Sequence, residues 1–456
     1  MIPSRVVQVI TTVNQIVKCK IIIIFDMTVS GSMISKKTDA LRMFIRRMMK
    51  DNLSCLKYIY IAQILFAVSW CVSAACPLAA AATPENIFQK YLGENDSIVV
   101  TDAASDTNLV RVHEDALLIP ASTLKLFTAL VAIHVLGKDY HFHTDFYVDN
   151  KNNLTIKGFG DPSLISEIIP DIAEQVGRKV TEINDIILDD TYFQTPVFIP
   201  GITADSTQPY DAPNGALCVN FNTVFFKKNG HGRYISAEPQ TPLLPFILNR
   251  INAASMNQGR IILSHENQEY ILYAGHLFRY FLSETVPVSG TVHQGAVDPR
   301  HDTRVLRYHS PYSLQDIIQK MLYYSNNFTA NQLLIAAGAS QYGTPGTLAK
   351  GVQAAKAFAA DNKKLTGMQL QEGSGISRGN RVSASMMDEI LKLFFPYRHL
   401  LKQGDRELFK TGTLTGIRTR AGYLETRNGK TIRYVVMLNS GRNRIDRIMK
   451  LLYRFY

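Results

Sequence analysis

The sequence predicts an α+β fold in which one antiparallel sheet is built from both ends of the chain, with helices packed on it and a β-rich insertion splitting the domain. Three observations support this prediction. Strand-like runs occur near residue 100 and again near the C-terminus. Helical periodicity fills much of the second half of the chain before the last strands. Residues 145–290 show many short strand-like runs separated by turn residues, with little long helical periodicity.

The first elements can be placed from the pattern of apolar residues. Two strands, 97–102 and 109–113, are joined by a polar turn. A helix is expected to open at Ser122 and to end at Gly137. Its apolar positions recur at helical spacing and are Leu124, Phe127, Leu130, Val131 and Val135.

The elements after the insertion are clearer. Helices are expected at 313–324, 328–337, 348–361 and 383–395. Strands 419–425 and 431–439 flank Asn428-Gly429, a strong hairpin signal. A basic amphipathic helix, 444–455, ends the chain. It is expected either to pack on its own sheet or to make a peripheral membrane contact.

The charge of the chain is concentrated near its N-terminus. The 456 residues carry a formal net charge of +11. Residues 1–76 hold 10 Lys and Arg against 3 Asp and Glu, whereas the remaining residues hold 39 against 35. We therefore expect no nucleic-acid partner, because the basic excess does not belong to the folded part of the chain.

Residues 1–82 are predicted to be a leader. Lys57 precedes an apolar run, 58–73, and the small residues Ala80-Ala81-Ala82 follow it. This pattern is typical of a signal peptide, assigned here to 48–82, for secretion across the inner membrane into the periplasm. An uncleaved anchor is the alternative. Residues 1–47 do not extend the signal and are interpreted as a non-native extension or a mis-called start.

Cysteine and histidine content indicates neither a disulfide framework nor a metal site. Only Cys218 of the five cysteines lies clearly in the mature chain. Cys76, at the edge of the leader, is a candidate for lipid attachment, although Ser73 is unfavourable three residues before it. The eleven histidines show no ligand spacing, so no metal and no cofactor are expected.

Three short motifs in fixed order carry the chemistry: Ser122-Thr123-Leu124-Lys125, Ser325-Asn326-Asn327 and Lys410-Thr411-Gly412. Each alone is weak, since a serine is also followed by a lysine three residues later at Ser54. Each also has an ordinary structural explanation, as a helix cap, a turn between helices and a loop. Their order and local setting match the motifs of serine β-lactamases and penicillin-binding proteins, which indicates an acyl-transfer enzyme.

The residue types fit that chemistry. A lysine three residues after a serine lies on the same helix face, and burial allows its amine to act as a base. The backbone N–H groups of Ser122 and Thr413 are expected to form an oxyanion hole. Lys410 and Thr411 would bind a substrate carboxylate. Ser325 would relay a proton and Asn327 would hold a substrate amide.

Beyond the motifs, the chain from about Pro84 onward resembles the penicillin-binding protein 4 type of D-alanyl-D-alanine carboxypeptidase and endopeptidase, a low-molecular-mass class C penicillin-binding protein. The segments that carry this resemblance are 158–164, 187–193, 210–222 and 372–378. The resemblance implies a transpeptidase-like domain, 83–145 and 291–456, split by inserted domains at 146–290. It also implies that Asp189 or Asp190, together with Arg378, contacts the diamino-acid side chain of the peptide. The stretch between Ser377 and Lys410 is short compared with many relatives. This leaves open how the protein covers its substrate and whether cross-linked peptides fit as well as free pentapeptides.

By the same resemblance, Ser122 would be the acylated nucleophile and Lys125 its base. Ser325, Asn327 and Lys410 would complete the catalytic set, and Thr411, Gly412 and Thr413 would line the opposite wall. The expected function is a serine DD-peptidase that acts on peptidoglycan stem peptides and is inhibited by β-lactams. A β-lactamase or esterase using the same serine and lysine is one alternative, and a non-catalytic peptidoglycan-binding protein is another.

Overall fold

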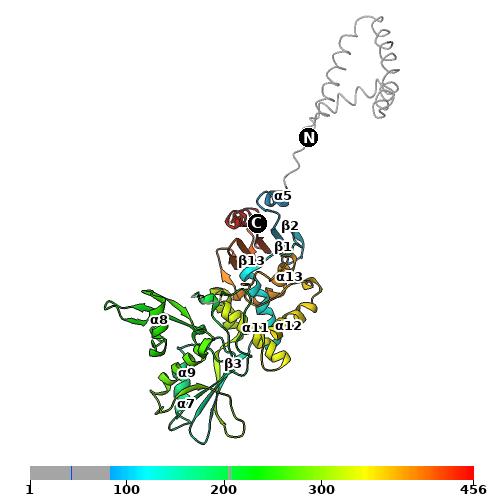
Figure 1. Ribbon diagram of the computed structural model, residues 1–456. Coiled ribbons are helices and arrows are strands. Elements are labelled where there is room, and N and C mark those ends of the chain that lie inside the picture. Colours follow the sequence, from blue (N-terminus) through cyan, green and yellow to red (C-terminus); the bar gives the residue numbers. More distant parts are fainter. Residues whose placement is uncertain (1–42, 44–82, 204–205, 207) are drawn as a thin grey trace. The chain divides into compact units, whose positions relative to one another are not determined.

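The computed structural model describes Met43 and residues 83–203, 206 and 208–456. Residues from Ala82 to Tyr456 form one compact unit. The predicted signal peptide, the predicted extension apart from Met43, and Cys76 lie outside the described residues. Figure 1 shows the elements of the compact unit with the labels used below.

The central element is a six-stranded antiparallel sheet with the order β11-β12-β13-β14-β1-β2. Its strands are β1 (Asp96–Asp102), β2 (Asn108–Val112), β11 (Lys402–Gln403), β12 (Glu407–Leu414), β13 (Ile417–Glu425) and β14 (Thr431–Leu438). Strand β1 pairs with β14, with Ile98 opposite Val436. The predicted sheet shared by the two ends of the chain is therefore confirmed, as is the hairpin at Asn428-Gly429.

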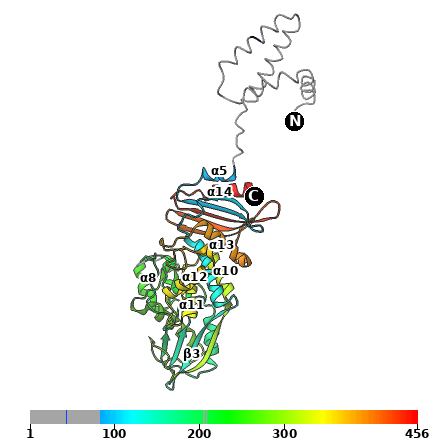
Figure 2. The same cartoon turned by 90° about the vertical axis from the view of Figure 1, so that its right-hand side faces the viewer.

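Helices cover both faces of this sheet (Figure 2). One face packs against the larger hydrophobic core, to which Val99 and Val435 contribute. The helices of that core are α6 (Lys125–Leu136), α10 (Leu314–Tyr324), α11 (Asn327–Tyr342), α12 (Leu348–Ala360) and α13 (Ala384–Phe394). The opposite face packs against α5 (Pro84–Gln89) and α14 (Ile445–Phe455).

The C-terminal helix α14 packs on its own sheet. Ile448, Met449 and Leu452 are buried in the core formed with α5 and the outer sheet face. The apolar stripe predicted from the sequence is thus largely covered by the protein. Within the described residues, no helix is long and apolar enough to cross a membrane.

The inserted region contains a five-stranded sheet with the order β10-β3-β4-β5-β9. Its strands are β3 (His141–Val148), β4 (Leu154–Gly158), β5 (Ile186–Asp189), β9 (Val292–Gln294) and β10 (Thr303–Ser313). The strands on the β10 side are antiparallel, whereas β4, β5 and β9 are parallel. This sheet spans residues 141–313 and so extends beyond the range 146–290 expected for the insertion.

A second, three-stranded sheet has the order β7-β6-β8, with β6 (Thr223–Lys228), β7 (Tyr234–Ser236) and β8 (Gln258–Ile262). The inserted region also contains α7 (Ile169–Gly177), α8 (Leu248–Ala254) and α9 (Glu269–Leu282). Short 3₁₀ segments complete the chain: Ala121–Leu124, Pro209–Asp211, Asn220–Asn222, Pro245–Ile247, Glu266–Gln268, Lys363–Leu365 and Phe395–Leu400.

The expectation that residues 145–290 contain little helix is wrong at α9. Nine of its fourteen residues are buried, so its apolar face is too wide to show a clear helical period. The aromatic and β-branched residues in the segment also favour strand in isolation. Packing against the five-stranded sheet decides the outcome, because the missing side chain of Gly275 lets the helix approach Leu188 and Val292 closely.

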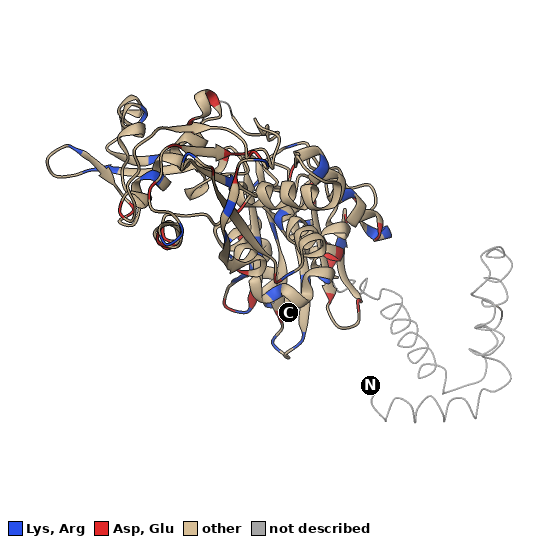
Figure 3. Ribbon diagram, turned by 90° about the horizontal axis from the view of Figure 1, so that it is seen from below, with Lys and Arg blue, Asp and Glu red and all other residues tan. Residues whose placement is uncertain are grey.

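Basic and acidic residues are interspersed along the ribbon of the described chain (Figure 3). This distribution agrees with the near balance of charge outside the leader.

Candidate active site

The first motif lies where the chain enters α6. Ser122 is in a 3₁₀ turn, Ala121–Leu124, and the α-helix itself begins at Lys125. The sequence predicted an α-helix from Ser122, so the first turn is tighter than expected. In a 3₁₀ turn, side chains three residues apart eclipse each other. The Lys125 Nζ therefore lies over the serine, 2.9 Å from Ser122 Oγ.

Lys125 is fully buried and has three hydrogen-bonding partners. Besides Ser122 Oγ, its amine lies 2.7 Å from Asn327 Oδ1 and 2.7 Å from the carbonyl oxygen of Ser374. Burial lowers the pKa of Lys125 well below its ordinary value, the cation of Lys410 lowers it further, and Glu372 acts in the opposite direction. The site therefore favours an uncharged amine.

The second motif is the turn between α10 and α11. Ser325 ends α10 with a left-handed backbone, φ 58°. Asn326 caps α11 by accepting a 3.0 Å hydrogen bond from the N–H of Thr329. Asn327 is the first residue of α11 and donates to the carbonyl of Tyr210 at 3.2 Å. These backbone restraints orient the side chains of Ser325 and Asn327 toward the first motif.

The third motif lies inside β12 rather than at its start. Lys410 Nζ donates to Ser325 Oγ at 2.8 Å, so the second and third motifs meet directly. Burial lowers the pKa of Lys410 to about 8, and the charge of Lys402 acts in the same direction. Thr411 and Thr413 are exposed on one face of the strand, as alternation along a strand requires.

Gly412 is required by the close approach of β12 to the serine segment. A Cβ at this position would lie 2.3 Å from Thr419 Oγ1, 2.8 Å from the nitrogen of Ser122 and 2.9 Å from the oxygen of Pro120. Real Cβ contacts are essentially never this short, so any larger residue would push the strand away. The contact also shows that the backbone nitrogen of Ser122 faces this strand.

A loop after α12 supplies the remaining partner of Lys125. The buried carboxylate of Glu372 accepts hydrogen bonds from the backbone N–H groups of Ser374, Gly375 and Ser377 and from the side chain of Asn380. Gly375 has φ 85°, and its position is in direct contact with the backbone of Ala121. This network fixes the Ser374 carbonyl that faces the lysine.

These elements enclose a cleft of about 630 Å³. Its lining residues are Ser122, Tyr210, Ser325, Asn327, Ile376, Thr413, Leu414, Thr415, Gly416 and Arg418. Ser122, Ser325, Asn327 and Thr413 were predicted as site residues. Arg418 was not, because it lies on the next strand opposite Thr413 and has no motif of its own. Its guanidinium donates to the carbonyl of Leu414 and adds a cation to the cleft.

The structure does not bring Asp189 and Asp190 into this cleft. Asp189 is fully buried and accepts from Lys157, Thr191 and Val297. Asp190 is 2% exposed and accepts from the N–H of Leu217 at 2.6 Å and from the hydroxyl of Tyr270. Burial raises the pKa of Asp190 to about 7.

The expected acidic pocket therefore needs correction, because both carboxylates are already bonded inside the inserted region. Arg378 is not among the residues that line the cleft. Its guanidinium donates to the carbonyl of Thr415, which does line it, so Arg378 lies at the rim. Within the described part of the chain, no group of histidine, cysteine and acidic residues is arranged to hold a metal ion.

The site combines a buried lysine that faces a serine, a second serine–lysine pair and a strand edge beside them. Together these features define a serine acyl-transfer site. Comparison with known proteins agrees with this class. Residues 80–395 match the D-Ala-D-Ala carboxypeptidase 3 (S13) family, and the chain belongs to this family. The match ends before Lys410, so the third motif is assigned by its place in the structure.

Two curated relatives and one solved structure show the extent of the similarity. A D-alanyl-D-alanine carboxypeptidase from an Actinomadura species is 27% identical over 66% of this chain and 64% of its own length. The chain thus matches somewhat less than two thirds of that relative. DacB, a D-alanyl-D-alanine carboxypeptidase of Haemophilus influenzae, is 23% identical over 81% of this chain and 90% of its own length.

The crystal structure of penicillin-binding protein 4 from Haemophilus influenzae has the same fold, with a TM-score of 0.62 and 18% identity. The similarity covers 78% of this chain and 93% of that structure. The fold and the family predicted from the sequence are thereby confirmed.

Proposed function

We propose that this protein is a serine DD-peptidase that removes the terminal D-alanine from peptidoglycan stem peptides through an acyl-enzyme on Ser122. The observation that carries the proposal is the set of contacts around Lys125. A neutral lysine amine has two N–H bonds and one lone pair. Asn327 Oδ1 and the Ser374 carbonyl are acceptors only and take the two N–H bonds, so the lone pair faces Ser122 Oγ.

In acylation, the lysine lone pair takes the Ser122 proton while Oγ attacks the carbonyl carbon of the penultimate D-alanine. The negative charge that develops on the carbonyl oxygen is stabilised by the N–H groups of Ser122 and Thr413. Ser325, bonded to Lys410, delivers a proton to the leaving nitrogen. The C–N bond breaks, D-alanine leaves, and an ester to Ser122 remains.

The substrate carboxylate fits the opposite side of the cleft. Lys410 and Arg418 provide positive charge, and Thr411 and Thr413 provide hydroxyl groups along one strand face. Charge-assisted hydrogen bonds of this kind are stronger than neutral ones. β-Lactams carry a comparable carboxylate beside a reactive amide, so we expect them to acylate Ser122 as well.

Hydrolysis of the ester by water completes the cycle. No carboxylate is among the described residues that line the cleft, and Glu114, which lies close to Ser122 in the sequence, is not one of them. A β-lactamase requires rapid deacylation by an activated water, so this lining favours a peptidase over a β-lactamase. The penicillin ester should therefore be long-lived.

Two finer points belong to the same proposal. Arg378, at the rim, is suited to bind an acidic group of a peptide that extends beyond the cleft, which would allow cross-linked peptides to be cut as well. The predicted signal peptide would place the enzyme in the periplasm, where these substrates occur.

Intact-mass measurement after incubation with a penicillin tests the proposal. We expect one adduct on the wild-type protein, mapped to Ser122, and none on Ser122→Ala. The wild-type protein should release D-alanine from a synthetic pentapeptide, and Ser122→Ala should not. The absence of labelling by penicillin would instead favour a non-catalytic binding protein, and rapid release of hydrolysed penicillin would favour a β-lactamase.

A further inference from the structure

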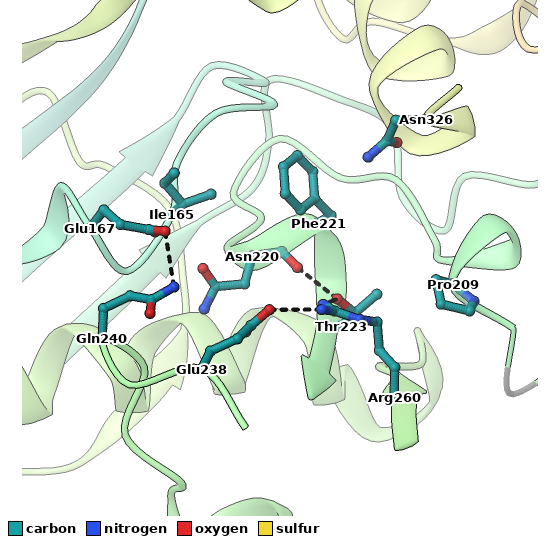
Figure 4. A pocket seen from close by; sticks show the side chains of 10 residues that line it. All are labelled: Ile165, Glu167, Pro209, Asn220, Phe221, Thr223, Glu238, Gln240, Arg260 and Asn326. Carbon is teal, nitrogen blue, oxygen red and sulfur yellow. Dashed lines mark hydrogen bonds and ion pairs between the residues drawn. The ribbon is translucent and has the colours of Figure 1, made fainter. Parts of the chain in front are cut away.

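A second pocket lies beside the catalytic cleft, and we call it the lateral pocket (Figure 4). Its volume is about 260 Å³. It is lined by Ile165, Glu167, Pro209, Asn220, Phe221, Thr223, Glu238, Gln240, Arg260 and Asn326. Two chain segments connect it to the cleft, since Pro209 precedes the cleft residue Tyr210 and Asn326 lies between Ser325 and Asn327. The two cavities are therefore neighbours along two chain segments.

The walls of the lateral pocket carry planar polar groups that are already oriented. Glu238 pairs with Arg260 at 2.7 Å, and Arg260 also donates to Thr223 Oγ1 at 2.8 Å. Gln240 donates to Glu167 at 2.9 Å. Each of these pairs uses one carboxylate oxygen, so the second oxygen of each glutamate can accept from a ligand. The pocket is thus rich in hydrogen-bond acceptors.

A strained turn forms one wall. Asn220, Phe221 and Asn222 follow one another with φ values of 49°, 57° and 53°, a left-handed conformation that asparagine tolerates but that is strained for phenylalanine. Hydrogen bonds from Ser166 to Asn220 and from Asn222 to Pro213 maintain the turn.

The turn places the ring of Phe221 at the pocket wall (Figure 4). This ring packs edge-on against Phe328, with the two ring centroids 6.1 Å apart. Strain that the surrounding structure maintains in this way is typical of a ligand site.

We propose that the lateral pocket binds an N-acetylated sugar of the glycan strand to which the stem peptide is attached. This inference rests on the proposed function. Sugar hydroxyls are donors for the free carboxylate oxygens of Glu167 and Glu238. The apolar face of a sugar ring fits the ring of Phe221. Since Asn326 uses its oxygen to cap α11, its amide nitrogen is the atom that can donate to an acetyl carbonyl.

The experiment compares two substrates that differ only in the sugar: the free pentapeptide and the same pentapeptide bearing its N-acetylated disaccharide. We expect wild-type kcat/KM to be higher for the disaccharide pentapeptide. The double variant Glu167→Ala with Gln240→Ala should lose about tenfold or more of that preference, because it removes a charge-assisted hydrogen bond to the sugar. Both side chains are exposed, so the fold should tolerate the change.

A matched control is Glu174→Ala with Gln175→Ala, a pair on α7 outside the pocket in which Glu174 is exposed and Gln175 is half-buried. It should keep the wild-type preference. Equal kcat/KM values for the two substrates in the wild type would overturn the inference. So would equal losses for both substrates in the Glu167 and Gln240 variant, which would indicate that the pocket binds peptide. Failure of the proposed function is a different result, because then neither substrate would release D-alanine.

Discussion

The ε-amine of Lys125 is held by two acceptors that cannot donate in return. In the proposed mechanism, this arrangement lets the buried lysine act as a base, because Asn327 and the Ser374 carbonyl accept its two N–H bonds and leave the lone pair toward Ser122. The motif itself predicts only that serine and lysine share a helix face. The orientation depends on residues from two other elements, α11 and the loop that contains Ser374.

We predict that Lys125→Ala slows penicillin acylation by about 10²–10⁴-fold, the usual contribution of a general base. The variant should remain folded, because the exchange removes a desolvated amine. Stopped-flow or mass-based acylation rates test this, with circular dichroism as the control for folding. An acylation rate equal to that of the wild type would rule out Lys125 as the base.

A second prediction concerns the pH dependence. The cation of Lys410 is needed for the substrate carboxylate and is lost as pH rises through its pKa of about 8, so acylation should decline above that pH. The positive charge of Lys402 helps to lower this pKa. Lys402→Ala should therefore move the alkaline limb of the acylation profile to higher pH. Lys402 is exposed and lies outside the cleft, so the maximum rate should change little.

At the scale of the elements, the sequence predicts regular segments well where one period dominates. Strands β1, β2, β13 and β14 and the helices after the insertion occur within about five residues of their expected ranges, whereas β11 and β12 had no predicted range. The prediction fails where packing decides: α9 has a wide apolar face, and the 3₁₀ turn at Ser122 depends on the approach of β12. Neither feature has a local signal that distinguishes it from a strand or an α-helix.

The position of β12 against the serine segment leads to a third prediction. In Gly412→Ala, the new Cβ would clash with the backbone nitrogen of Ser122, so the strand must move. A shift of about 1 Å in an active site can cost about 10²-fold in rate. We expect a fall of this size in penicillin acylation. Gly230→Ala, at a position with no neighbouring atoms within 4 Å, is the control and should acylate at the wild-type rate.

At the scale of the whole molecule, a buried set of hydrogen bonds is among the contacts that attach the inserted region to the catalytic domain. The side chain of Asn214 donates to Gln332 Oε1 at 2.8 Å and to the carbonyl of Phe328 at 3.0 Å. Gln332 in turn donates to the carbonyl of Gly215 at 2.6 Å. These contacts attach the segment that follows Tyr210 to α11, which bears Asn327.

The sequence could predict the three motifs as one site because their order and setting are specific. It could not predict that Asp189 and Asp190 are used internally, because an acidic pair at a strand end has the same pattern whether it faces a ligand or a buried Tyr270. The partners that decide the matter come from distant segments. The same holds for Arg418 and for the Asn214–Gln332 contacts.

The last prediction tests that attachment. In Gln332→Ala, the Asn214 amide and the Gly215 carbonyl lose buried partners, and each buried polar group left unpaired costs about 1–3 kcal/mol. The free energy of unfolding, measured by denaturant titration, should fall by at least that amount. Gln341→Ala, an exposed glutamine on the same helix, should stay within about 0.5 kcal/mol of the wild type. Equal stability of the two variants would mean that the hydrogen bonds of Gln332 to Asn214 and Gly215 add nothing measurable to this attachment.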